Sequence, residues 1–141
     1  MKRIIICVIL VVCVWTKVNA QGCPIFEYTF LNQSNVDNFR RNFPNCKSLV
    51  EPLNIQGNSV TNLDSLIGLE QIHTLRITNA PNLTSLRGLD NVCVQTGDFV
   101  LDGTGVVNLA QYQPSWVDST RSIVIQNNHS LRDVTGFVAL K

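Results

Sequence analysis

The chain has 141 residues, of which 45% are hydrophobic, 15% charged and 7% aromatic, and its formal net charge is +1. This length predicts a single domain, because two compact domains rarely fit into so few residues. The near-neutral charge excludes the basic surface that nucleic-acid binding requires, so no nucleic acid is expected as a partner.

The first 20 residues have the pattern of a secretory signal peptide. Lys2 and Arg3 precede an apolar run that ends at Trp15, and small residues lead to a cleavage position at Ala20. The run is shorter than the roughly 20 residues of a membrane-spanning helix, so no integral membrane segment is expected. Removal of 1–20 leaves 121 residues with 8 basic and 10 acidic side chains, a net charge of −2. The sequence therefore predicts a secreted protein, either extracellular or on the cell surface.

Three cysteines remain after the predicted signal peptide, at Cys23, Cys46 and Cys93. Export leads to an oxidising compartment, in which a disulfide can persist. Because three is an odd number, at least one of these thiols must stay outside any intramolecular disulfide. The cysteine count alone leaves the pairing open.

Residues 21–52 predict an N-terminal cap made of a strand and a short helix. Phe26–Phe30 alternates aromatic and polar residues, which is the period of a half-buried strand. Ser34 stands where a helix N-cap is expected, and the apolar residues of Asn35–Phe43 fall on one helical face. Pro44 then ends the helix.

Residues 53–141 repeat a strand-like segment. Its four copies start 22, 24 and 24 residues apart, at Leu53, Leu75, Phe99 and Ile123. In each copy the first and third residues are apolar and are expected to face the interior. The fifth residue is glycine or asparagine, the two types that most readily adopt a positive φ, so a tight corner is expected there. These corners are Gly57, Asn79, Gly103 and Asn127.

A leucine-rich segment follows three of these strands, at Asn62–Leu69, Asn82–Leu89 and Ser130–Phe137. Its apolar residues are three apart, which could indicate a helix, but the glycine within each copy disfavours one. We predict that the leucines point inward from short strands or turns of a coil. A repeat of this length is typical of a solenoid, here a mainly β structure of about four coils.

Short motifs in the cap and in the repeats resemble a receptor L domain, the leucine-rich-repeat-like domain of insulin-receptor and EGF-receptor ectodomains. They are similar to those of secreted bacterial proteins that carry such domains. The motifs are Gly22–Pro24, Val36–Phe39, Phe43–Cys46, Leu75–Ile77 and Asn82–Leu89.

The resemblance implies a right-handed β-helix with a disulfide between Cys23 and Cys46 in its cap. The C-terminal cap of the family is missing from the sequence, which ends at Lys141. Because solenoids need end repeats that shield the core, we expect either a truncated domain or an open C-terminal end that something else covers. Such an end predicts possible self-association.

No catalytic motif is present, and no cofactor or metal is expected. The two histidines, His73 and His129, fall in unrelated positions of the repeat and are expected to be ordinary loop residues. Asp98 and Asp102 are predicted to lie about 13 Å apart on one strand, at ~3.3 Å per residue. Glycosidases place their carboxylates ~5 to 9.5 Å apart, so the sequence predicts that the protein is not an enzyme.

The outward positions of the predicted strands form the candidate binding face. The exposed strands of a solenoid commonly bind a partner, so we predict recognition or adhesion toward a protein or carbohydrate ligand. The face consists of Asn54, Gln56, Arg76, Thr78, Val100, Asp102, Val124 and Gln126. The alternatives are a merely solvated face, a spacer or fragment of a larger receptor-like surface protein, and, less favoured, a carbohydrate-active enzyme. Tyr112 and Trp116 are expected to pack a longer linker onto the coil, although they could contact a ligand.

Overall fold

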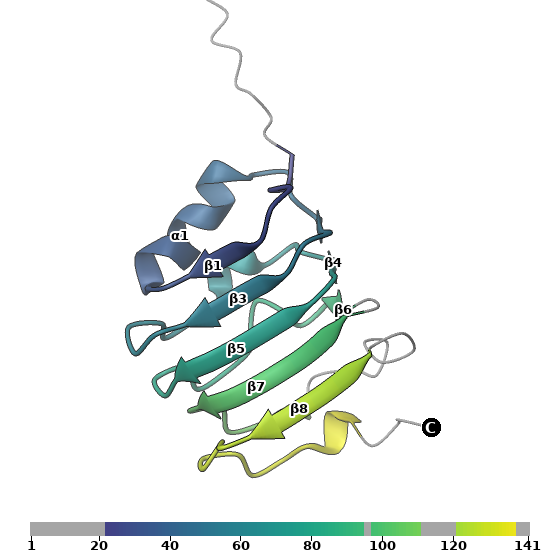
Figure 1. The fold of residues 1–141 in the computed structure, drawn as a ribbon. Helices are drawn as coiled ribbons and strands as arrows, with labels where there is room; N and C mark the ends of the chain where they lie inside the picture. The colour runs from purple at the N-terminus through teal and green to yellow at the C-terminus, as the bar shows by residue number, and fades with distance from the viewer. Residues whose placement is uncertain (1–21, 95–96, 111–120, 138–141) are drawn as a thin grey trace, which may run out of the picture.

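The computed structural model describes residues 22–94, 97–110 and 121–137 of the chain (Figure 1). These residues form a small α/β domain with two parallel sheets, of five and three strands, and one α-helix. The predicted signal peptide lies outside the described residues. Among the residues that are described, none belongs to a helix long and apolar enough to cross a membrane.

The larger sheet consists of five parallel strands in the order β1-β3-β5-β7-β8. They are β1 (Tyr28–Phe30), β3 (Leu53–Gln56), β5 (Leu75–Ala80), β7 (Asp98–Thr104) and β8 (Ser122–Gln126). The four repeated segments pair in the register that their alignment predicts, with Leu53, Leu75, Phe99 and Ile123 opposite one another. Figure 1 shows the five strands side by side, from β1 next to the helix to β8.

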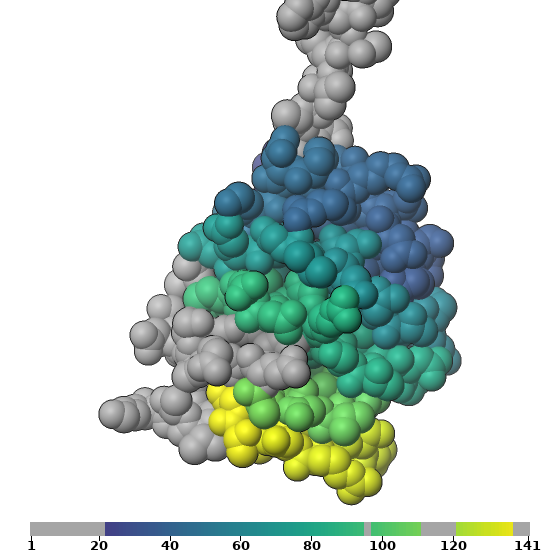
Figure 2. Space-filling model, turned by 180° about the vertical axis from the view of Figure 1, so that it is seen from behind, coloured from purple at the N-terminus to yellow at the C-terminus, as the bar shows by residue number. Residues whose placement is uncertain are grey.

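The smaller sheet is built from strands of only two residues each. They are β2 (Ser48–Leu49), β4 (Gln71–Ile72) and β6 (Cys93–Val94), and they also pair in parallel in the order β2-β4-β6. Viewed from behind, the described residues follow one another in chain order from the N-terminal to the C-terminal end of the domain (Figure 2).

The prediction of a mainly β, right-handed β-helix or leucine-rich-repeat-like solenoid of about four coils was wrong. In the described part of the chain neither sheet closes on itself, and the two sheets remain separate. The strands of the smaller sheet are too short to make a continuous second wall, and a ten-residue helix packs beside β1. The finding is therefore a small α/β domain with two parallel sheets.

The leucine spacing of three has its physical origin in tight turns. The amide of Leu66 donates to the carbonyl of Leu63, and the amide of Leu69 donates to that of Leu66, at 2.8 and 3.0 Å. The same bonds join Leu86 to Leu89 and Leu89 to Val92 in the next copy. These i→i+3 bonds have the three-residue period of a 3₁₀ turn, and η1 (Asp64–Leu66) is such a turn. A second one, η3 (Thr135–Phe137), follows β8.

The corners after the strands adopt the positive φ that their residue types predict. Gly57 and Gly103 have φ values of 113° and 65°, and Asn79 and Asn127 have values of 50° and 55°. An asparagine tolerates this left-handed conformation better than most residues, because its short polar side chain can bond locally. The expectation of tight corners is confirmed at all four positions.

Among the residues that the structure describes, a hydrophobic cluster fills the interior. The inward residues of β3, β5 and β7 are fully buried, as are the leucines of the turns that follow β3 and β5. Ile123 and Ile125 on β8 are only half-buried against this cluster. The core therefore lies along β3, β5 and β7, and it holds the opposite face of the same strands toward solvent.

The helix α1 (Gln33–Asn42) begins earlier than the sequence predicts. Its N-cap is Asn32, whose side-chain oxygen accepts a hydrogen bond from the amide of Asn35 at 3.0 Å, and not Ser34. Val36 and Phe39 are buried and attach the helix to the core. Asparagine and serine both cap helices well, so local preference does not choose between Asn32 and Ser34, which are two positions apart.

The N-terminal cap is held by a disulfide and by aromatic packing. Cys23 and Cys46 form the disulfide that the resemblance implies. Tyr28 packs edge-on against Phe30, Phe39 and Phe43, with ring centroids 5.3 to 5.7 Å apart. The strand of the cap is shorter than expected, starting at Tyr28 rather than Phe26. It pairs with β3, so the cap extends the larger sheet.

Candidate functional site

The candidate site is the solvent-facing side of the larger sheet, and the eight residues selected from the sequence all lie on it. Parallel pairing in register arranges them in two rows that cross the strands. The first row is Asn54, Arg76, Val100 and Val124. The second row is Gln56, Thr78, Asp102 and Gln126.

The geometry of a sheet determines the dimensions of this face. Neighbouring strands lie ~4.8 Å apart, so each row of four residues is about 14 Å long. The alternation of side chains keeps the inward neighbours Ile55, Ile77 and Leu101 fully buried, while the outward residues are half-buried or exposed. Because the backbone is hydrogen-bonded on both sides in β3, β5 and β7, the face is a rigid platform.

An ion pair links β5 to β7 across the face. The Arg76 guanidinium donates to the Asp98 carboxylate at 3.1 Å, and their side chains are 40% and 30% exposed. Partial exposure weakens the pair in energetic terms but leaves both charges accessible to a ligand. The sequence indicates Asp98 only as half of a possible acidic pair, because its position next to Arg76 depends on the pairing of β5 with β7.

Asp102 is the most strongly bonded carboxylate of the face. Gln126 and Asn127 donate their side-chain amides to its two oxygens, at 2.9 and 2.8 Å. These two bonds, first that from Gln126 and then that from Asn127, lower the pKa of Asp102 below its ordinary value of 3.8. Asp102 is therefore a fixed negative charge, held in place by two side chains of the β8 region.

The face extends one strand further than the sequence predicts. Asn54 donates its side-chain amide to Glu27 and to the hydroxyl of Thr29, which lies opposite Asn54 on β1. Thr29 is the polar residue between Tyr28 and Phe30, so the alternation predicts that its side chain faces outward. The repeat pattern does not indicate that β1 joins this sheet, because β1 lies before the first repeated segment.

Two aliphatic residues form the end of the first row at β7 and β8. Val100 and Val124 are opposite each other on β7 and β8, and both are half-buried. They lie in one row with Arg76 and next to the row of Asp102. The face thus combines the cation of Arg76, the carboxylates of Asp98 and Asp102, and a small apolar strip.

The acidic and histidine residues of the described chain do not converge. Asp98 pairs with Arg76, whereas Asp102 bonds to Gln126 and Asn127 at the other end of β7. His73 lies between β4 and β5, and His129 lies in a turn after β8. Within the described ranges, no three of the His, Cys, Asp and Glu side chains come together in a group that could hold a metal ion.

Two sequence interpretations concern positions away from this face. Tyr112 and Trp116 lie outside the described residues, so their predicted packing on the domain stays a prediction. Cys93 is half-buried in β6, on the smaller sheet, and does not take part in the Cys23–Cys46 disulfide.

Comparison of the chain with family models, with curated proteins and with solved structures finds no match in any of the three. Nothing in them identifies a receptor L domain, and the resemblance of the short motifs stays a prediction.

Proposed function

We propose that this protein is a non-enzymatic recognition module that binds a macromolecular partner outside the cell through the exposed face of its larger sheet. One observation carries the proposal. Charged, polar and aliphatic side chains from four parallel strands are aligned in two rows on a rigid surface. Such a surface has the preorganised groups that recognition needs, because little side-chain freedom is lost on binding.

Two features support an extracellular location. The disulfide between Cys23 and Cys46 is of the kind that persists in oxidising compartments. The pattern of the first 20 residues is that of a secretory signal peptide. The motif resemblance to receptor L domains favours the same class of function.

The charge distribution of the face favours a protein over a glycan as the partner. Arg76 and Asp98 present opposite charges within 3.1 Å of each other, with Asp102 further along the same strand. A neutral sugar is bound mainly by aromatic stacking and hydrogen bonds, whereas a protein surface can match both signs of charge. We therefore expect an extracellular protein domain with complementary charges, and glycan binding is the alternative outcome.

The test is a binding screen with a matched control. The purified disulfide-bonded chain without residues 1–20 is applied to an array of extracellular protein domains and to an array of glycans. Any partner found is then titrated against the double variant Arg76→Ala/Asp102→Ala, for which we expect at least tenfold weaker binding. The control is Arg87→Ala/Asp64→Ala, which removes an ion pair of 3.3 Å that lies away from the sheet face.

Equal affinity of the two double variants for the partner would contradict the assignment of the face. Absence of any partner on both arrays would instead support the alternative of a structural spacer within a larger surface protein. Binding to glycans alone, lost in the face variant, would keep the face and change the class of partner.

A further inference from the structure

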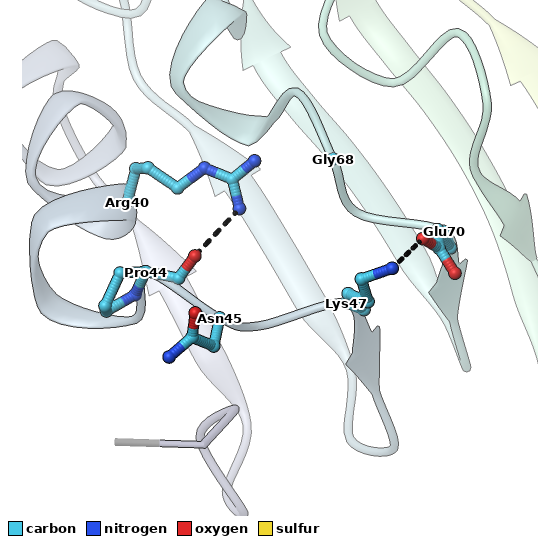
Figure 3. Close-up of a pocket in the computed structure, with 6 residues that line it drawn as sticks. All are labelled: Arg40, Pro44, Asn45, Lys47, Gly68 and Glu70. Carbon is cyan, nitrogen blue, oxygen red and sulfur yellow. Dashed lines mark hydrogen bonds and ion pairs between the residues drawn. The ribbon is translucent and has the colours of Figure 1, made fainter. Parts of the chain in front are cut away.

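A pocket of about 300 Å³ lies away from the sheet face, where the end of α1 meets the segment between η1 and β4 (Figure 3). Its polar lining comes from Arg40 of the helix, Asn45 and Lys47 of the chain that follows it, and Glu70. Ligand pockets range upward from about 300 Å³, so this one has room for a small molecule and not for a folded segment.

Arg40 is held in a defined orientation at the wall of the pocket. Its guanidinium donates to the carbonyl of Pro44 at 3.4 Å and to the carbonyl of Ile67. A guanidinium has five N–H donors, so these two bonds leave three for other acceptors. Within the part of the chain that the structure describes, no ion pair joins Arg40 to a carboxylate. Arg40 is therefore a fixed cation with remaining donors and no counter-charge.

The glycine at position 68 makes room for this arginine. Gly68 has a φ of 99°, and a Cβ added there would collide with Nη2 of Arg40. In the next repeat the same space beside Gly88 is occupied by the backbone carbonyl of Leu63. A side-chain cation thus takes the place that a backbone oxygen has one repeat later.

A second cation stands opposite and is already paired. Lys47 donates to Glu70 at 2.6 Å, and both side chains are more than half exposed. Figure 3 shows Arg40 reaching over the Pro44–Asn45 turn, with the Lys47–Glu70 pair on the far side of the pocket. Two positive charges and one negative charge leave the lining with a net charge of +1. The chain as a whole carries 8 basic and 10 acidic residues after position 20, so this local excess is opposite to its net charge.

We propose that this pocket binds a small polar molecule that carries a carboxylate. The carboxylate binds Arg40, and the other polar groups of the molecule bind Asn45 and Lys47. A guanidinium presents paired donors that match the two oxygens of a carboxylate. An uronic acid and an N-acylated acidic amino acid both offer this group on a body of suitable size. The proposal is independent of the sheet face and of its partner.

The binding test uses heteronuclear NMR titration of the disulfide-bonded chain with D-galacturonate, N-acetyl-L-glutamate and, as a neutral probe, D-galactose. We expect saturable shifts around Arg40 and Asn45 with one or both of the acids and none with galactose. Arg40→Lys keeps the positive charge and removes the paired N–H donors of the guanidinium, so we expect at least fivefold weaker binding. Added salt should weaken binding further, because the pocket is open to solvent.

A gain-of-affinity variant separates binding from the structural role of Arg40. Glu70→Gln removes the competing carboxylate and releases Lys47, so we expect binding about three- to tenfold tighter. A role of Arg40 in packing alone would not produce this gain. The matched control is Asp64→Asn, which removes the carboxylate of another exposed ion pair, with Arg87, and should leave the affinity unchanged.

Failure of all probes to saturate, or equal affinity of Glu70→Gln and the unsubstituted chain, would overturn the proposal. The sheet-face variant Arg76→Ala/Asp102→Ala should bind the carboxylates normally. A loss of pocket binding in that variant would show that the shifts do not report this pocket. Binding of one acid and not the other would support the proposal and would show whether the carboxylate is carried by a sugar or by an amino acid.

Discussion

Individual charged side chains on the larger sheet are held by neighbours on adjacent strands. Asp102 receives two amide donors from the β8 region, and Arg76 pairs with Asp98. These bonds join residues 22 to 25 positions apart in the sequence. They depend on the repeat length, because a strand displaced by one residue would turn its outward side chains into the core.

The lowered pKa of Asp102 gives a prediction about pH. Because its pKa is lower in the folded than in the unfolded chain, the carboxylate stabilises the fold above pH 3.8, and this contribution is lost as the pH falls through the folded-state pKa. We expect an NMR titration of the carboxyl carbons to give Asp102 a pKa below 3.8. Gln126→Ala should raise it, since the bond from Gln126 is the largest cause.

Two comparisons within the same experiment control this result. Gln56→Ala removes an amide from the same row at β3, two strands away, and should leave the titration of Asp102 unchanged. Asp133 also has a lowered pKa, through bonds from the backbone and side chain of Thr135, and should be unaffected by Gln126→Ala. A pKa of Asp102 that does not respond to Gln126→Ala would refute the role of this bond.

The corner residues show what a single position reveals in a sequence. Asn79 and Asn127 adopt positive φ where glycines stand in the other copies, and the residue type was enough to predict this. The N-cap of α1 shows the opposite case. Asn32 and Ser34 are both good caps, and the choice of Asn32 depends on where Val36 and Phe39 reach the core.

For the cap, the sequence predicts the two elements β1 and α1 correctly but places their ends inaccurately. The sequence pattern predicts a strand and a helix for its aromatic residues, and the structure contains both. The helix is shifted toward the N-terminus, and the strand is shorter than the alternating pattern. The strand begins at Tyr28, although the alternation begins at Phe26, because the residues paired with β3 are Tyr28, Thr29 and Phe30.

The disulfide of the cap gives a prediction about stability. Cys23 and Cys46 are separated by 23 positions, and closing a loop of this length lowers the entropy of the unfolded chain. The loop-entropy model predicts about 3 kcal/mol of stabilisation. We expect Cys23→Ala/Cys46→Ala to lower the free energy of unfolding in urea by about that amount, in the range of 2–4 kcal/mol.

A reductant provides the control for the disulfide. It should destabilise the unsubstituted chain and leave the double variant unchanged, because the variant has no disulfide to lose. An equal response of both proteins to the reductant would show that another effect is being measured, and an unchanged free energy of unfolding in the variant would contradict the prediction.

The described part of the domain is built around a cluster of buried hydrophobic residues. Ile77 lies on β5, the central strand of the larger sheet, and is fully buried. We expect Ile77→Ala to lower the free energy of unfolding by about 2–5 kcal/mol, because the substitution leaves a cavity. Chemical denaturation followed by circular dichroism would measure it.

The same substitution at an exposed position is the matched control. Ile67 is 51% exposed, and Ile67→Ala should cost less than about 1 kcal/mol. A similar cost at both positions would show that the core does not extend through β5 as the burial indicates.

The repeated strands, their register, their inward residues and the corners that follow them can all be predicted from the sequence. Each of these depends on local residue type and on a period that parallel pairing preserves. The eight outward positions follow from the same alternation, so their place on one face could be predicted.

The architecture between the strands depends on long-range packing, which the sequence pattern does not specify. A leucine every third residue fits a coil, a helix or a series of 3₁₀ turns, and the bonds from Leu66 to Leu63 and from Leu69 to Leu66 select the turns. The same holds for the second sheet, whose two-residue strands have no period to detect, and for the pocket at Arg40. Its residues come from segments some 30 positions apart, and only the packing of α1 against η1 brings them together.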